Sequence, residues 1–194
     1  MTLKFGTDGV RGVADEELTV DLVTNLGRAA ARVLGARTFI VGRDTRQSGP
    51  HLQHAFSRGV AAEGADVVDI GVLPTPAVAR LCAARGAAGA VVSASHNPWT
   101  DNGVKVFAPG GRKLSDAVEE RLEAELAALA EAPASTAATG HISVDAGAPG
   151  WYVAQLLESL DGCSLDGLHV VLDCANGASA PVAERVFTEA GARV

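Results

Sequence analysis

The sequence predicts an α/β fold, a three-layer α/β/α sandwich whose central sheet is mixed and mostly parallel. Short runs rich in β-branched residues alternate with segments of helical periodicity, which is typical of such sheets. The runs are apolar at consecutive positions, as expected for strands that are buried on both faces. The same alternation resumes near residue 141, so we expect one domain at residues 1–140 and the beginning of a second, similar domain at residues 141–194.

Four runs are predicted as strands, each short, apolar and bounded by glycine or charge: residues 38–41, 66–70, 88–92 and 169–172. Helices are predicted around them, at residues 19–34, 50–63, 75–84, 115–131, 151–159 and 181–190. Thr19 is a typical N-cap, and Gly35 and Gly64 are placed to end the first two helices. Residues 132–149 are small, polar and rich in Pro and Gly, so we expect a linker there.

The composition excludes several classes of protein. Lys and Arg number 16 against 23 Asp and Glu, a net charge of −7, whereas binding to nucleic acid requires clustered cations. No stretch approaches the roughly 20 apolar residues of a membrane span, and the charged N-terminal segment is unlike a signal peptide. Cys82, Cys163 and Cys174 form no CxxC pair and are predicted as core or near-core residues in a reducing compartment. We therefore expect an acidic cytoplasmic protein with no nucleic-acid or membrane partner.

The densest group of polar residues follows the buried run at residues 88–92. It reads SASHNP and contains Ser93, Ser95, His96 and Asn97. Ligands of open α/β sheets bind beyond the carboxyl ends of the strands, which is where this segment lies. A serine there can carry a covalent intermediate when its neighbours activate it, although the same residue types are also common in ordinary turns.

Cations are concentrated in glycine-rich segments that we interpret as loops. Arg11 lies in FGTDGVRG, Arg43 and Arg46 lie in GRDTRQSG, and Lys105 lies in DNGVK. The protein is acidic overall, so this concentration is specific to these segments. Cations close to Ser95 are what a phosphorylated serine or a phosphorylated substrate requires.

Other candidate sites have weaker support. The chain contains neither GxxxxGK[ST] nor GxGxxG after a strand, so nucleotide binding by those motifs is unsupported. His51 and His54 are one helical turn apart without a carboxylate partner, and we interpret them as surface residues of a helix. The segment DCANG at residues 173–177 fits a functional loop and an Asn-Gly turn equally well.

Taken together, FGTDGVRG, GRDTRQSG, SASHNP followed by DNGVK, and DCANGA resemble the α-D-phosphohexomutase superfamily. Within it they are most similar to the bacterial phosphoglucosamine mutases, which interconvert glucosamine 6-phosphate and glucosamine 1-phosphate on the route to peptidoglycan precursors. The resemblance covers nearly the whole chain, with the motifs in the same order. It implies a phosphosugar mutase of four domains, of which this sequence is the N-terminal portion.

The resemblance also implies a role for each matching residue. Ser95 would carry a phosphoryl group, give it to the sugar phosphate to form a bisphosphate, and take back the other phosphate. Lys105 is implied as the general acid/base, while Arg11, which stays protonated, would act mainly on the phosphate. His96 would orient the loop or the phosphoserine. The positions expected to bind phosphate or substrate are Thr7, Asp8, Arg43, Ser93 and Asn97.

A Mg²⁺ ion is implied as well, with an oxygen of phosphorylated Ser95 as one of its ligands. The acidic DGDGDR segment that supplies the remaining ligands in the family does not occur in this chain, and we expect it beyond Val194. The sugar-recognition and phosphate-binding loops of the later domains do not occur here either. We therefore expect the chain alone to bind Mg²⁺ weakly and to turn over hexosamine phosphate negligibly. A homodimer, and activation by a kinase or by a sugar bisphosphate, stay open.

Three other interpretations stay open too. A phosphomannomutase or phosphoglucomutase of the same superfamily would share these motifs, because the loop that reads the sugar lies elsewhere. A serine hydrolase that uses Ser95 and His96 is disfavoured, since adjacent side chains point in different directions and no Gly-x-Ser-x-Gly segment surrounds the serine. A non-catalytic module that binds phosphosugars would also retain the motifs.

Overall fold

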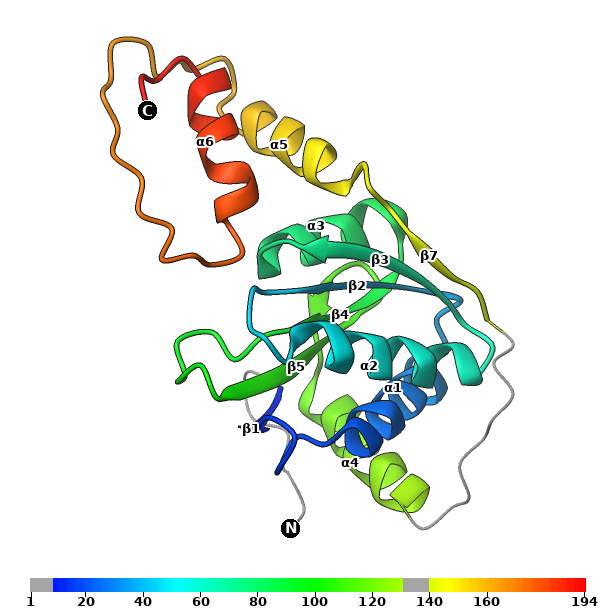
Figure 1. Cartoon of the computed structure of the whole chain (residues 1–194). Coiled ribbons are helices and arrows are strands. Elements are labelled where there is room, and N and C mark those ends of the chain that lie inside the picture. Colours follow the sequence, from blue (N-terminus) through cyan, green and yellow to red (C-terminus); the bar gives the residue numbers. More distant parts are fainter. Residues whose placement is uncertain (1–8, 131–139) are drawn as a thin grey trace.

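A computed structural model describes residues 9–130 and 140–194 of the chain (Figure 1). Its sheet runs in the order β1-β5-β4-β2-β3-β7, with β6 beside β5. The strands are β1 (Val10–Val13), β2 (Thr38–Arg43), β3 (Asp66–Val72), β4 (Ala88–Val92), β5 (Asp101–Ala108), β6 (Arg112–Lys113) and β7 (Ile142–Val144). The helices are α1 (Val20–Leu34), α2 (Gly49–Ala62), α3 (Thr75–Arg85), α4 (Asp116–Ala130), α5 (Ala148–Glu158) and α6 (Ala180–Glu189).

Helices cover both faces of the sheet, which confirms the predicted three-layer sandwich. One apolar cluster joins the sheet to α1, α2 and α4, and a second joins its other face to α3, α5 and α6. Figure 1 shows α3 on one side of the sheet and α1, α2 and α4 on the other. β2, β3, β4 and β7 pair in parallel, whereas β1, β5 and β6 pair antiparallel.

The parallel part of the fold follows from local sequence. β4 is buried at every position, and so is the middle of β2, which explains their uninterrupted apolar character. Thr19 caps α1 as predicted, its Oγ1 accepting a hydrogen bond from the Leu22 amide at 3.2 Å. Gly35 ends that helix in the left-handed conformation at φ 59°.

Two strands lie where the sequence predicted loops. The residues that begin β5, Asp101, Asn102 and Gly103, are common in turns, and β1 is four residues long with a glycine inside it. Both nevertheless pair antiparallel, Arg11 opposite Gly103 and Val91 opposite Lys105. Arg11 and Lys105 are therefore held on strands, not on loops.

The segment expected to begin a second domain, residues 141–194, which we call the second unit, differs from the prediction in two places. Within the expected linker, residues 142–144 form β7, which pairs with β3, and α5 already begins at Ala148. The first sheet thus extends beyond residue 140, while residues 132–139 of the expected linker lie outside the described part. The strand expected at residues 169–172 is a single parallel bridge between His169 and Arg193, because no described strand continues the pairing.

The second unit packs on the first through α5. Tyr152 and Val153 are buried in the cluster that contains Leu81 of α3. Cys82 is also buried there, and burial raises the pKa of its thiol to about 12. The prediction of a core or near-core position is wrong for Cys163, which is exposed. In the described ranges, no helix has the length and apolar character needed to cross a membrane.

Candidate functional site

The segment after β4 forms an exposed loop, residues 93–100, which we call the Ser95 loop. Where the loop leaves the sheet, the Ser93 amide donates a hydrogen bond to the Gly103 carbonyl at 2.9 Å. The Ser93 hydroxyl accepts from the Ser95 amide at 3.1 Å and donates to Asp44 Oδ2 at 2.7 Å. Ser95 itself is exposed and adopts φ 56°, a conformation that is uncommon for residues other than glycine. Its hydroxyl is therefore presented to solvent at the end of a buried strand.

Arg46 reaches under this loop from the segment between β2 and α2. Its guanidinium donates to the backbone carbonyls of Ser95 at 3.0 Å, Asn97 at 2.9 Å and Asp101 at 2.9 Å, and also to that of Pro98. Its Nε donates to the Asp44 carboxylate at 3.1 Å. An arginine has five N–H donors, and these five contacts use all of them. Contrary to the sequence-based expectation, Arg46 binds the backbone of the loop and has no donor left for a phosphate.

Arg11 and Lys105 lie on the same face of the sheet. Arg11 is paired with Gly103, and Lys105 stands two residues further along β5, so their side chains project from one face at diagonal positions. Arg11 Nη1 donates to Asn97 Oδ1 at 3.1 Å, and Asn97 Nδ2 donates to Asp101 Oδ2 at 3.0 Å. The structure thus brings Arg11 against the Ser95 loop, with Lys105 beside it on the neighbouring strand.

Each residue of the DNG sequence contributes to this arrangement. Asp101 accepts from Asn97, and the buried Asn102 donates from its Nδ2 to Ser48 Oγ at 2.9 Å. A Cβ atom on Gly103 would come within 2.9 Å of the carbonyl oxygens of Ser93 and Val10. The position therefore requires glycine so that β1 and the Ser95 loop can approach β5 closely.

The remaining predicted site residues are His96, Arg43, Thr7 and Asp8. His96 is exposed, with Nδ1 3.4 Å from Ser95 Oγ. Arg43 ends β2, and its Nη1 donates to the Asp44 carbonyl at 3.3 Å, so it supports the GRDTR segment. Thr7 and Asp8 lie outside the described residues.

A groove of about 760 Å³ opens beside Ser95 and has walls from both units. One wall is formed by residues 44–47, and the facing wall is the loop at residues 175–179, in front of α6. Thr45 joins the two walls, since its Oγ1 donates to the Asn176 carbonyl at 2.7 Å. Sequence reasoning left the DCANG segment undecided, and the structure places its last residues at this groove.

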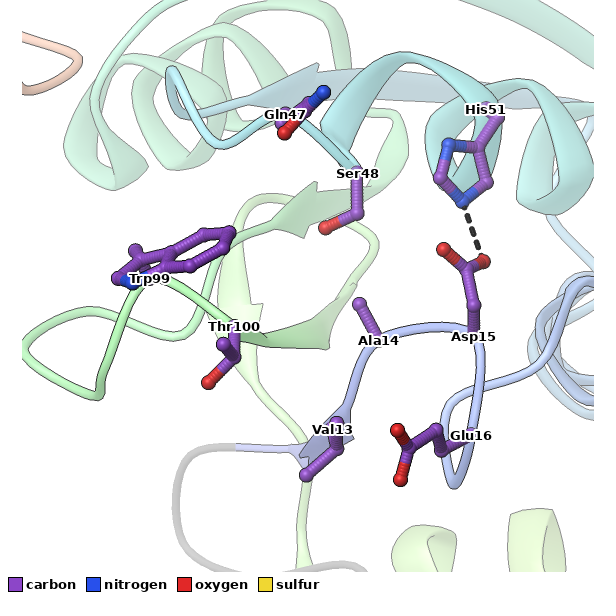
Figure 2. A pocket seen from close by; sticks show the side chains of 9 residues that line it. All are labelled: Val13, Ala14, Asp15, Glu16, Gln47, Ser48, His51, Trp99 and Thr100. Atoms are coloured by element: carbon purple, nitrogen blue, oxygen red, sulfur yellow. Dashed lines mark hydrogen bonds and ion pairs between the residues drawn. The ribbon is translucent and has the colours of Figure 1, made fainter.

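A second cavity of about 520 Å³ is lined by residues 13–16, by residues 47, 48 and 51, and by residues 99 and 100 of the Ser95 loop (Figure 2). Trp99, whose surface is 77% exposed, lines both this cavity and the groove. His51 lies here with its Nε2 2.8 Å from Asp15 Oδ1, which links α2 to the turn after β1. His51 and His54 are both exposed on α2, as predicted.

The described residues do not by themselves fit a magnesium site. Among them, no group of three or more His, Cys, Asp or Glu side chains is placed to hold a metal ion. Two carboxylates accept hydrogen bonds from the Ser95 loop: Asp44 accepts from Ser93 and also from Arg46, and Asp101 accepts from Asn97. A Mg²⁺ ion requires about six oxygen ligands, so we derive no chemical step through a metal held by these residues.

The expectation that the remaining Mg²⁺ ligands lie beyond Val194 stays a prediction. Ser95 is the one metal-linked position predicted within this chain.

Comparison with known proteins decides the family. The family model of the α/β/α domain I of phosphoglucomutases and phosphomannomutases matches residues 2–133. The chain belongs to the phosphoglucomutase/phosphomannomutase family. The Ser95 loop, the Arg46 contacts, Arg11 and Lys105 all lie within this family domain.

Two curated relatives carry the same name. The chain is 49% identical over 198 residues to a phosphoglucosamine mutase of Rhodococcus jostii and 51% identical over 192 residues to one of Clavibacter michiganensis. Each match covers 98% of this chain but only 44% and 43% of the relative. A solved phosphoglucomutase/phosphomannomutase family protein of Burkholderia thailandensis aligns with all of this chain and 43% of its own, with 28% identity and a TM-score of 0.82. The chain thus spans less than half the length of these relatives, and its fold aligns over its whole length with part of the solved one.

Proposed function

We propose that this chain is the N-terminal part of a phosphoglucosamine mutase, in which Ser95 carries the transferred phosphoryl group. The observation that carries the proposal is the exposed Ser95 hydroxyl, held at the edge of a groove with Arg11 bound to the same loop. The name shared by the curated relatives supports glucosamine phosphates as the substrates.

In the proposed reaction, phosphorylated Ser95 donates its phosphoryl group to the free hydroxyl of glucosamine 6-phosphate or glucosamine 1-phosphate. The bond from phosphorus to Ser95 Oγ breaks, a bond to the sugar oxygen forms, and a base receives the proton of the sugar hydroxyl. The resulting sugar bisphosphate reorients in the site and transfers its other phosphoryl group back to Ser95. Such transfers depend chiefly on alignment and on neutralising charge, so cations on fixed strands suit the task.

Arg11 and Lys105 have separate parts in this proposal. Arg11 is a permanent cation on β1 that also fixes Asn97, and we assign it to the phosphate. Lys105 can lose a proton and is assigned the general acid/base role. His96, next to Ser95, orients the phosphoserine, while Thr7, Asp8, Arg43, Ser93 and Asn97 support or bind the phosphate.

The proposal is tested by intact-mass analysis of the full-length enzyme together with Ser95→Ala. We expect one added phosphate in the wild-type protein, and we expect Ser95→Ala to lose both that phosphate and turnover. A phosphate mapped to another residue would refute the assignment of Ser95. The alternative function is that of a phosphoglucomutase or phosphomannomutase, the two activities in the family name of the solved relative. The relative kcat/KM values for glucosamine, glucose and mannose phosphates distinguish the two functions.

A serine hydrolase is the less favoured alternative. The Ser95 Oγ to His96 Nδ1 distance of 3.4 Å is at the outer limit of a hydrogen bond, and Asp44 contacts Ser93 and Arg46. A catalytic triad instead requires the carboxylate to orient the histidine. Labelling of Ser95 by a fluorophosphonate probe would support the hydrolase over the mutase.

We further propose that the mutase needs residues outside this sequence, including the remaining Mg²⁺ ligands beyond Val194. We expect residues 1–194 alone to bind Mg²⁺ weakly and to show no measurable mutase turnover, since the described residues hold no carboxylate cluster. Turnover by the purified chain, measured with either glucosamine phosphate, would contradict this. The domain boundary near residue 140 and the cytoplasmic location stay predictions.

A further inference from the structure

Arg46 lies in a different segment of the chain from the Ser95 loop, yet most of its hydrogen bonds go to backbone carbonyls of the loop and of Asp101 directly after it. Four of its five N–H donors go to carbonyls between Ser95 and Asp101, and the side chain is 11% exposed. Four carbonyl oxygens that converge on one point repel each other unless a cation lies between them. A planar guanidinium can satisfy all four, whereas a lysine ammonium has only three donors and no fork geometry.

Asp44 fixes the guanidinium in place. Its carboxylate accepts from the Arg46 amide at 3.0 Å and from Arg46 Nε at 3.1 Å, while the Asp44 amide donates to the Val92 carbonyl at the end of β4 at 3.0 Å. The same carboxylate accepts from Ser93, whose hydroxyl accepts from the Ser95 amide. One carboxylate therefore connects Arg46 and the Ser95 amide to the frame of the sheet.

The loop needs such support, because it is exposed and holds Ser95 in a conformation that costs free energy. The positive φ of Ser95 persists only where its surroundings impose it. We propose that Asp44 and Arg46 are a positioning pair that holds Ser95 in this geometry for phosphoryl transfer, an inference that rests on the proposed function. Arg46 acts through the loop backbone and does not itself bind the phosphate.

The first test measures backbone amide hydrogen exchange in this chain and does not depend on any activity. In Arg46→Met we expect the amides of Ser95, Asn97 and Asp101 to exchange at least about 10-fold faster, while the amides of β2 and β4 keep their rates. Arg46→Lys, which keeps the charge but not the fork, should give the same local change. The matched control is Arg58→Met, on the exposed face of α2, which should leave the loop unchanged.

The second test measures steady-state kinetics of the full-length enzyme with the same variants. We expect kcat to fall about 100-fold in Arg46→Met and Arg46→Lys with KM within about threefold, because misplacing a reacting group impairs the transition state more than binding. In Arg46→Ala, added methylguanidinium should restore part of kcat. Wild-type kcat in Arg46→Met would overturn the proposal.

The two tests separate the possible failures. Faster exchange throughout the sheet would mean that Arg46 only stabilises the fold, and unchanged exchange in the loop would mean that it does not hold the loop; either result refutes the positioning role. A wild-type enzyme without mutase turnover would refute the proposed function, while the exchange data still decide whether Arg46 holds the Ser95 loop.

Discussion

At the scale of single residues, the site depends on positions that have no freedom to change. Gly103 is the clearest case, because the carbonyls of Ser93 and Val10 and the side chain of Arg11 surround the place where a Cβ atom would lie. The crowding comes from three segments that meet at β5: β1, the Ser95 loop and β5 itself. A change at Gly103 would therefore displace the loop as well as the strand.

Gly103→Ala is expected to destabilise the protein by about 1–3 kcal/mol, because the backbone must shift to admit the methyl group. Urea unfolding of this chain measures the loss. Gly150→Ala is the matched control, since the nearest atom outside its helix is 3.7 Å away and alanine favours α5. Equal stability of Gly103→Ala and the wild-type chain would show that the contacts around Gly103 are looser than described.

Sequence reasoning predicted the candidate residues but not how they are held. Ser95 and the cations Arg11 and Lys105 stood out by their residue types in short motifs, and the family resemblance gave these three residues and His96 their expected roles. Arg46 was counted only as one of the clustered cations suited to a phosphate, since a guanidinium that binds carbonyls and one that binds phosphate look alike in a sequence. The signal that could have corrected it is Asp44, a carboxylate two residues away that competes with any phosphate for the same donors.

At the scale of elements, an ion-pair network joins three helices on one face of the sheet. Glu63, which follows α2, accepts from Arg28 and Arg32 of α1 at 2.8 Å each, and Arg32 also contacts Glu125 of α4 at 2.8 Å. Arg28 and Glu63 are nearly buried, with 5% and 16% of their side chains exposed. Burial raises the pKa of Glu63, but the hydrogen bonds from Arg32 and Arg28 outweigh it, so the pKa lies below its ordinary value of 4.5.

A lowered carboxyl pKa means that Glu63 stabilises the fold above its ordinary pKa and that this stabilisation disappears as the pH falls through the lower folded value. We expect Glu63→Gln to lose about 2 kcal/mol at neutral pH, and the difference from wild type to shrink as the pH falls through the lowered pKa of Glu63 in the folded protein. Urea unfolding at neutral and at acidic pH measures it. Glu189→Gln, which disrupts an exposed ion pair with Arg185, should change stability by less than about 0.5 kcal/mol. A Glu63→Gln difference that grows on acidification would contradict the assignment.

The strands illustrate why some elements escape sequence reasoning. β2 and β4 are central and parallel, so their apolar runs reveal them. β1 and β5 carry the candidate site residues Arg11 and Lys105 on one face and are ordered by pairing with each other and with β4, which no local sequence pattern shows. The strand expected at residues 169–172 does not form, because the local sequence favours a strand but the pairing partners are lacking in the described residues. Its residues favour a strand, but His169 has one bridge partner and Val171 is 98% exposed.

At the scale of the whole molecule, the two units share one apolar cluster. α5 buries Tyr152 and Val153 against α3, and Arg85 of α3 donates to Asp145, just before α5, at 2.6 Å. Thr45 adds a hydrogen bond to the 175–179 loop beside the groove. The second unit thus depends on the first for much of its core.

This shared core predicts a single thermal transition for residues 1–194. Val153→Asp places a carboxylate in the cluster, which should lower stability by several kcal/mol and split off an earlier transition of α5 and α6. Differential scanning calorimetry measures both. Val171→Asp makes the same substitution at an exposed position and should leave the transition unchanged. Two transitions in the wild-type chain would mean that the units fold separately.

The left-handed backbone conformation of Ser95 also means that a serine at this position lowers the stability of the fold. A non-glycine residue at φ 56° costs about 1–3 kcal/mol, and glycine would relieve that cost while removing the hydroxyl. Ser95→Gly is therefore expected to stabilise the fold while it removes the hydroxyl that we propose carries the phosphoryl group. Stability alone would favour glycine here, and the proposed phosphoryl transfer gives a reason for a serine at a position where it costs stability.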